Sequence, residues 1–164
     1  MLLAEALASR ADNALLSYDL VWLIHLVGDV HQPLHAAARF SAALDDDRGG
    51  NDEMVQPSHG SSVKLHQFWD SRLGGDMTPV EAIMASRRLP SVDLDAASAT
   101  GPALWIIESF ALAQNVVYTD LIGDGTGPFD LTKAYEDQAL AVSQRQAALA
   151  GARLGRLINT ALAK

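Results

Sequence analysis

Two short windows of this sequence place a histidine four residues before an aspartate, a spacing that carries meaning only on an α-helix. The first pair is His25 and Asp29, and the second is His66 and Asp70. Residues four apart lie one turn apart on the same helix face, so each pair predicts helical backbone and two side chains that can act together. Imidazole and carboxylate groups are ligands that zinc takes in proteins, and the two windows therefore predict zinc binding.

The spacing argues against a single site. His25 and His35 are ten residues apart, which is about 15 Å along a helix axis, whereas a zinc–nitrogen bond is about 2 Å. Pro33 also lacks an amide hydrogen and is expected to end or kink the helix. His35 can instead join His66 and Asp70, giving three ligands and an open position for water, the pattern of a catalytic zinc site.

The alternative for each pair is an ordinary contact. A lone His-x-x-x-Asp pair on a helix is more often a surface contact or a buried hydrogen bond than a metal site. Two such pairs together with His35 favour metal, although His25 and Asp29 would supply only half of a second site.

Composition indicates one helical domain. The 164 residues are 49% hydrophobic but only 6% aromatic, and Ala and Leu dominate, which favours packed helices over a large sheet. We therefore expect an all-α fold, a multi-helix bundle over residues 1–164 with one irregular loop or short hairpin insertion. The sequence contains no cysteine, no apolar run long enough for a membrane span, and no signal-peptide pattern.

The net charge of −8 limits how the chain can bind nucleic acid. Twelve Lys and Arg stand against twenty Asp and Glu, which counts against tight binding through the phosphate backbone and against coating a duplex. An anionic substrate can still bind if the positive charge is that of the metal itself, because bound ions can dominate the local charge.

Local patterns place the expected elements along the chain. Ser17 is a plausible N-cap for the helix that carries the first His–Asp pair, and Thr78-Pro79 is a good helix start. A turn-rich loop covers Asp45–Asn51. A short hairpin is expected from Asp52–Gln56 and Ser62–Leu65. Helices are expected over residues 1–15, 18–32, 66–73, 78–88, 102–121 and 131–163.

Several other polar residues receive non-catalytic interpretations. His31 points away from the His25–Asp29 face and is expected to be a hydrogen-bonding partner. His59 is expected to be a solvated loop residue, and Glu108 a buried partner without a catalytic role. The acidic run 45–47 lacks the glycine and distal glutamate of a calcium loop and is expected to be a solvated turn.

Trp69 and Trp105 are expected to pack in the core or beside the metal.

The motifs together resemble a known family. The run His25–His35, the triplet Gly49-Gly50-Asn51 and the run Leu65–Ser71 resemble the type I nucleases, the zinc-dependent, single-strand-specific nucleases of the mung bean type. This family is structurally related to bacterial zinc phospholipase C. Weaker similarity continues in family order through Trp105–Ser109, Val117-Tyr118 and Ala150–Leu154.

The resemblance implies a mostly helical fold with three zinc ions in a cleft. His25 would bind the first zinc, and Asp29 would bridge the first and third and serve as the catalytic carboxylate. The second zinc would be held by His35, His66 and Asp70. The loop Gly49, Gly50 and Asn51 would contact the nucleobase.

The same resemblance implies the activity. Family members hydrolyse single-stranded DNA and RNA to 5′-nucleotides, and many remove 3′-phosphates from mononucleotides. They are usually secreted or periplasmic, but this chain carries no signal peptide on which to base a localisation.

The chain also departs from the family pattern. Family members carry further ligands before the His-x-x-x-Asp helix, including an N-terminal Trp, two His and an Asp, whereas none of the 24 residues before His25 is a histidine. We expect this chain to be the C-terminal part of the nuclease domain, with the second zinc site complete and the other two half-built. A separate chain could supply the missing ligands.

Two alternatives to a nuclease stay open. One is a non-catalytic or weakly active metal-binding fragment. The other is a phosphodiesterase like zinc phospholipase C, although the Gly-Gly-Asn loop and the Leu-His-x-x-Trp-Asp motif favour nucleic acid over lipid as the substrate.

Overall fold

The computed structural model describes residues 13–42, 45–99 and 101–163, and this part of the chain is mainly helical. Its three-stranded sheet is small, and the expected helical fold is confirmed. The helices are α2 (Asn13–Asp29), α3 (Leu65–Asp70), α4 (Pro79–Ser86), α5 (Leu94–Ser98), α6 (Pro102–Leu112) and α7 (Lys133–Leu162). The strands are β1 (Met54–Gln56), β2 (Val63–Lys64) and β3 (Phe129–Asp130).

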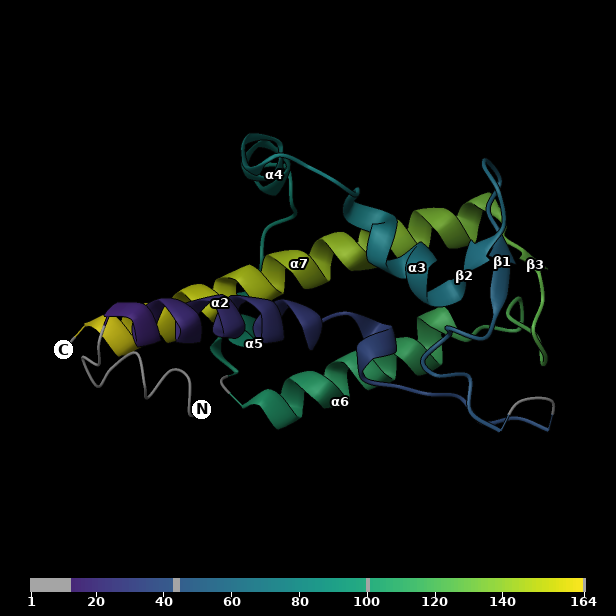
Figure 1. Cartoon of the computed structure of the whole chain (residues 1–164), viewed down its shortest axis with the longest axis horizontal. Coiled ribbons are helices and arrows are strands. Elements are labelled where there is room, and N and C mark those ends of the chain that lie inside the picture. Colours follow the sequence, from purple (N-terminus) through teal and green to yellow (C-terminus); the bar gives the residue numbers. More distant parts are fainter. Residues whose placement is uncertain (1–12, 43–44, 100, 164) are drawn as a thin grey trace.

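Helix α7 organises the molecule. Its 30 residues span about 45 Å, with α2 beside its C-terminal half and α3 beside its N-terminal half (Figure 1). The side chain of Thr132 accepts a hydrogen bond from the amide of Tyr135 and caps the helix start. The predicted helix over residues 131–163 is confirmed within two residues at each end.

Helix α2 differs from the prediction at its start and at its end. The helix runs from Asn13, and Ser17 lies inside it rather than at its N-cap. No Gly or Pro lies between Asn13 and Ser17, so the helix continues through Ser17. The helix ends at Asp29, and Pro33 opens a 3₁₀ turn, η1 (Pro33–His35). Most of the helix predicted over 1–15 lies outside the described residues.

The predicted hairpin is present, and a third strand joins it. Strands β1 and β2 pair antiparallel, with Val55 opposite Val63. Strand β3 pairs parallel with β1, with Val55 opposite Phe129. This strand was not predicted because it is only two residues long and its partner lies more than seventy residues away. Gly127, at φ +75°, allows the approach, because a Cβ there would lie 2.2 Å from the carbonyl oxygen of Met54.

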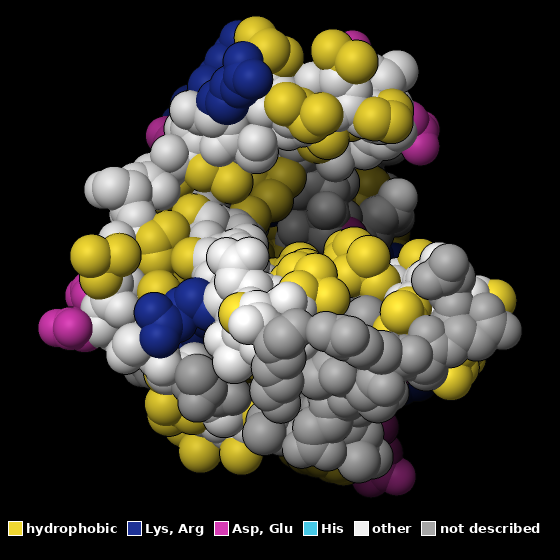
Figure 2. Space-filling model, turned by 90° about the vertical axis from the view of Figure 1, so that its left-hand side faces the viewer, with side chains coloured by type: hydrophobic (Ala, Val, Ile, Leu, Met, Phe, Trp, Pro, Cys, Tyr) yellow, Lys and Arg dark blue, Asp and Glu magenta, His cyan; other side chains and the backbone are white. Residues whose placement is uncertain are grey.

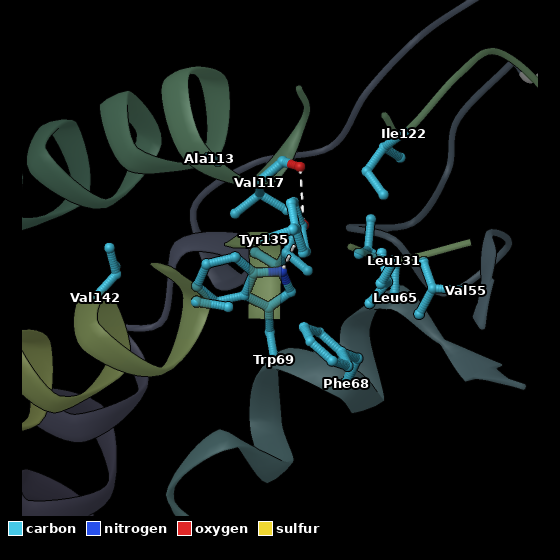
Figure 3. Close-up of a cluster of buried hydrophobic side chains, with 12 residues drawn as sticks. Val55, Leu65, Phe68, Trp69, Ala113, Val117, Ile122, Leu131, Tyr135 and Val142 are labelled. Carbon is cyan, nitrogen blue, oxygen red and sulfur yellow. Dashed lines mark hydrogen bonds between the residues drawn. The ribbon is translucent and has the colours of Figure 1, made fainter. Parts of the chain in front are cut away.

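Aromatic side chains fix α3 onto α7 in the larger core (Figure 3). The hydroxyl of Tyr135 donates to the carbonyl of Val117 at 3.0 Å and accepts from the indole Nε1 of Trp69 at 3.1 Å. Val117 ends a π-helical turn, η3 (Ala113–Val117), that extends α6, so the predicted helix over 102–121 is shorter than expected. The packing role predicted for Trp69 is confirmed.

A second core joins α2, α6 and α7. Leu23, Val27, Trp105 and Ala150 are buried together there, which confirms the core position predicted for Trp105. None of the helices in the described ranges has the length and apolar character needed to cross a membrane.

Candidate metal centre

Three of the predicted ligands come together. His35 ends the η1 turn, while His66 and Asp70 lie one turn apart on α3. The Nε2 atoms of His35 and His66 are 3.1 Å apart, and the rings stack with an interplanar angle of 14°. Asp70 places Oδ1 3.5 Å from His35 Nε2 and Oδ2 3.4 Å from His66 Nε2. Among the described residues, this is the one group of three or more such side chains close enough to share an ion.

The loop that contains Gly49 and Gly50 forms hydrogen bonds with both the ring and the backbone of His66. The Nδ1 atom of His66 lies 2.7 Å from the carbonyl oxygen of Gly49, and its backbone amide donates to the carbonyl of Gly50. Gly49 has φ +63°, and a Cβ there would lie 2.7 Å from the carbonyl oxygen of Leu34. Only glycine fits so closely against the η1 turn, which explains the Gly-Gly pair in chemical terms.

The partner of each Nδ1 atom determines whether the Nε2 atom of the same ring carries a hydrogen. A carbonyl oxygen only accepts, so His66 Nδ1 must carry its hydrogen toward Gly49. His35 Nδ1 likewise faces a carboxylate oxygen of Asp29 at 3.0 Å. In the neutral rings both Nε2 atoms then hold lone pairs, and these point at one another and at the Asp70 carboxylate. Such an arrangement is unfavourable without a cation between the three groups, and this donor set therefore fits a bound metal ion.

Gln32 links two of the candidate ligands. Its Nε2 donates to Asp70 Oδ1 at 2.9 Å, and its Oε1 accepts from the backbone amide of Leu34. The same side chain therefore caps the turn that carries His35 and orients the Asp70 carboxylate. Sequence reasoning missed this role, although the position of Gln32 directly before Pro33 is a signal for an N-cap.

Asp29 and His25 have separate environments. Asp29 contacts His35 and lines a cavity of about 400 Å³ that His35 and Asp70 also line. His25 is exposed, packs edge-on against the ring of Trp22, and does not line this cavity. The structure thus brings Asp29 to the group of three ligands and leaves His25 outside it.

His31 belongs to a buried network that joins three helices. Its Nδ1 donates to the carbonyl of Val27, and its Nε2 accepts from Arg153 Nη1 at 2.9 Å. Arg153 also forms two hydrogen bonds with the carboxylate of Glu108. Burial lowers the pKa of His31, which keeps the ring neutral and able to accept from Arg153. His31 and Glu108 each share a hydrogen bond with Arg153, which agrees with the partner roles predicted for them. Glu108 is partly exposed rather than buried as expected, and the central role of Arg153 was missed.

The acidic run 45–47 is only partly the solvated turn that we expected, because Asp45 and Asp46 are exposed whereas Asp47 is not. Asp47 is fully buried, and its carboxylate accepts from the amides of Arg39 and Gly49 and from the hydroxyl of Tyr118. This carboxylate shapes the loop that supports His66. Asn51 completes the loop by donating its side-chain amide to the carbonyl of Arg48. His59 is exposed, as predicted.

The comparison with known families agrees with this geometry. A model of the S1/P1 nuclease family matches residues 2–163, nearly the whole chain. The chain belongs to the S1/P1 nuclease family. This confirms the type I nuclease resemblance. No curated protein matches the chain in a sequence search.

Membership in the S1/P1 nuclease family gives the general chemistry of the centre. S1/P1 nucleases are hydrolases that act on phosphodiester bonds, and zinc dependence is general among them. The group of His35, His66 and Asp70 supplies two nitrogens and a carboxylate, and two of these residues, His35 and Asp70, line the cavity. Such a site can hold an ion and still accept a phosphate oxygen or a water.

Proposed function

We propose that this chain is a zinc-dependent nuclease that hydrolyses single-stranded DNA and RNA to 5′-nucleotides, with 3′-nucleotidase activity toward mononucleotides. The observation that carries the proposal is the convergence of His35, His66 and Asp70, of which His35 and Asp70 line a cavity together with Asp29. In an S1/P1 nuclease, two imidazoles and a carboxylate with an open position are suited to zinc rather than to magnesium or calcium, which prefer oxygen ligands.

Each residue has a distinct task in this proposal. Zinc, when bound, would polarise the phosphate and lower the pKa of a bound water. Asp29 holds His35 in the tautomer that leaves Nε2 free, and Gly49 does the same for His66. We assign the catalytic role to Asp29, because its partly exposed carboxylate borders the cavity where the phosphate would lie.

The loop Gly49, Gly50 and Asn51 is proposed to contact the nucleobase. The loop is fixed against His66 and therefore lies beside the phosphate position. Single-stranded substrates fit this arrangement, because an unpaired base can leave its stack and reach a loop next to the metal.

A second candidate is a chain that binds metal but cleaves weakly or not at all. The position of His25 favours it, since His25 lies apart from the three ligands and no described group of three includes it. A separate chain that supplies further ligands to His25 and Asp29 would restore the full nuclease centre.

Zinc-supplemented digestion of end-labelled single-stranded DNA separates the two candidates. The proposed nuclease should cleave the strand, His66→Ala and Asp29→Asn should abolish the cleavage, and His59→Ala, a control in an exposed loop, should retain it. Zinc binding with only weak cleavage or none would select the second candidate. Cleavage that survives His66→Ala would contradict the assignment of the centre.

A further inference from the structure

A second hollow lies next to the metal-site cavity. It has a volume of about 300 Å³ and lies between α4 and α7, and we call it the α4–α7 groove. Its walls include Leu73, Met77, Leu89 and Leu140 together with the arginines Arg72 and Arg88. Leu73 lines both the metal-site cavity and this groove, so the two hollows are neighbours on the segment that follows Asp70.

Helix α4 stands away from the body of the molecule and forms one wall of this groove (Figure 1). The capping box of Thr78 and Glu81 fixes the start of the helix. Figure 2, a view from the end of the molecule near the C-terminus, shows basic, acidic and hydrophobic side chains on the upper lobe and a hollow beneath it.

The charge around the groove is opposite to that of the whole chain. The chain has a net charge of −8, yet the residues that line the groove include two arginines and no carboxylate. Arg88 is exposed and takes part in none of the ion pairs found among the described residues. Arg72 is held in place, because its Nε donates to the carbonyl of Phe68 and its guanidinium lies over the Phe68 ring.

We propose that the α4–α7 groove binds the part of a single-stranded nucleic acid that extends beyond the phosphate at the metal centre. The arginines would contact backbone phosphates, and the apolar walls would contact the bases, which is the combination that single-strand sites use. This inference rests on the proposed nuclease function and adds a preference for oligonucleotides over mononucleotides. A duplex would not fit, because its bases are stacked inside and cannot reach the apolar walls.

The test measures binding rather than cleavage. The zinc-loaded chain is titrated with a fluorescein-labelled oligothymidylate at several salt concentrations, and separately with thymidine 3′-phosphate. We compare Arg88→Gln and Arg88→Glu with Arg145→Glu, a charge-matched control at an exposed position of α7 that lines neither hollow.

Loss of one phosphate contact should lower the salt slope of oligonucleotide binding by about 0.7, which is about fivefold in affinity per tenfold change in salt. We expect this decrease in the salt slope for Arg88→Gln, a larger decrease for Arg88→Glu, and no decrease for Arg145→Glu. Affinity for thymidine 3′-phosphate should stay unchanged in all three variants.

Several results would overturn the proposal. Equal losses of oligonucleotide affinity in Arg88→Glu and Arg145→Glu would show that only the overall charge matters. No loss in either variant would show that the groove does not bind substrate, while the proposed nuclease function would stand. Failure of the unmodified chain to bind either ligand would instead overturn the proposed function and, with it, the groove. The same variants are also tested for binding to vesicles of anionic phospholipid. Weaker vesicle binding by Arg88→Glu with unchanged oligonucleotide binding would assign the groove to lipid and overturn the proposal.

Discussion

At the scale of single residues, each metal-facing imidazole is fixed by an acceptor on the other side of its ring. Gly49 supplies a carbonyl to His66, and Asp29 supplies a carboxylate to His35. Such acceptors set the tautomer and the ring orientation before any ion binds. The centre is therefore organised by the protein fold, and its affinity should depend on residues that do not touch the ion.

Gln32 provides the clearest example, and replacing it should weaken zinc binding without unfolding the chain. Gln32→Met removes both the hydrogen bond to Asp70 and the cap of the η1 turn. Loss of such an orienting contact typically lowers metal affinity by about 10–100-fold. Competition with a chelator of known affinity measures the change. Gln67→Met, an exposed substitution on α3 next to His66, should leave the affinity unaltered; a matching loss there would contradict a specific role for Gln32.

The residues that sequence reasoning found and missed differ in the range of their contacts. The candidate ligands His66 and Asp70 were predicted because they lie four residues apart on one helix. His35 lies 31 residues before His66, and its place beside them was predicted from the family resemblance and from its distance to His25. Asp47 was misjudged because its partner Tyr118 lies 71 residues further along the chain. Arg153 was missed for the same reason, since His31 and Glu108 lie 122 and 45 residues away. The local sequence cannot distinguish an exposed aspartate from a buried one when its hydrogen-bonding partner is distant in the sequence.

At the scale of elements, helix ends with chemical signals were predicted well. Thr78-Pro79 marks the start of α4, and the structure shows the capping box there. The boundary at Ser17 was wrong because a serine caps a helix only where the chain before it is not helical. The π-helical turn after α6 has no comparable local signal, and packing of Ala113 and Val117 into the core accompanies it.

Tyr135 tests how strongly α3, α7 and η3 depend on one another. Tyr135→Phe removes the hydroxyl that bridges Trp69 and the carbonyl of Val117 and leaves both groups without this partner. The expected loss at pH 7 is about 1–3 kcal/mol in the free energy of unfolding. Urea denaturation followed by Trp fluorescence measures it, with Tyr18→Phe as an exposed control. A loss no larger than that of the control would contradict the bridging role.

The stability difference between the unmodified chain and Tyr135→Phe should depend on pH. Burial raises the pKa of Tyr135 above its usual value of 10. The folded-state pKa lies above the unfolded-state pKa, so the contribution of Tyr135 to stability is complete below pH 10. The contribution falls as the pH rises above 10, because the unfolded chain loses the proton first. The difference between the unmodified chain and Tyr135→Phe should therefore shrink above about pH 10 in the same denaturation experiment.

At the scale of the whole molecule, α7 aligns the two cores and the metal centre. The larger core fixes α3, which carries His66 and Asp70. Helix α2 packs in the second core, ends at Asp29 and leads into the turn that carries His35. The sequence predicted this helical frame from composition and periodicity. The parallel strand β3 and the groove under α4 depend on contacts between distant segments, which composition and periodicity do not reveal.

The central claim is that His35, His66 and Asp70 form a zinc site, and counting bound zinc tests it most directly. The purified chain is equilibrated with zinc, passed through a desalting column and analysed by inductively coupled plasma mass spectrometry. We predict one tightly bound zinc per chain, its loss in His66→Ala, and its retention in His59→Ala, with circular dichroism confirming that each variant folds. Absence of zinc from the folded, unmodified chain, or a full equivalent retained by His66→Ala, would contradict the account.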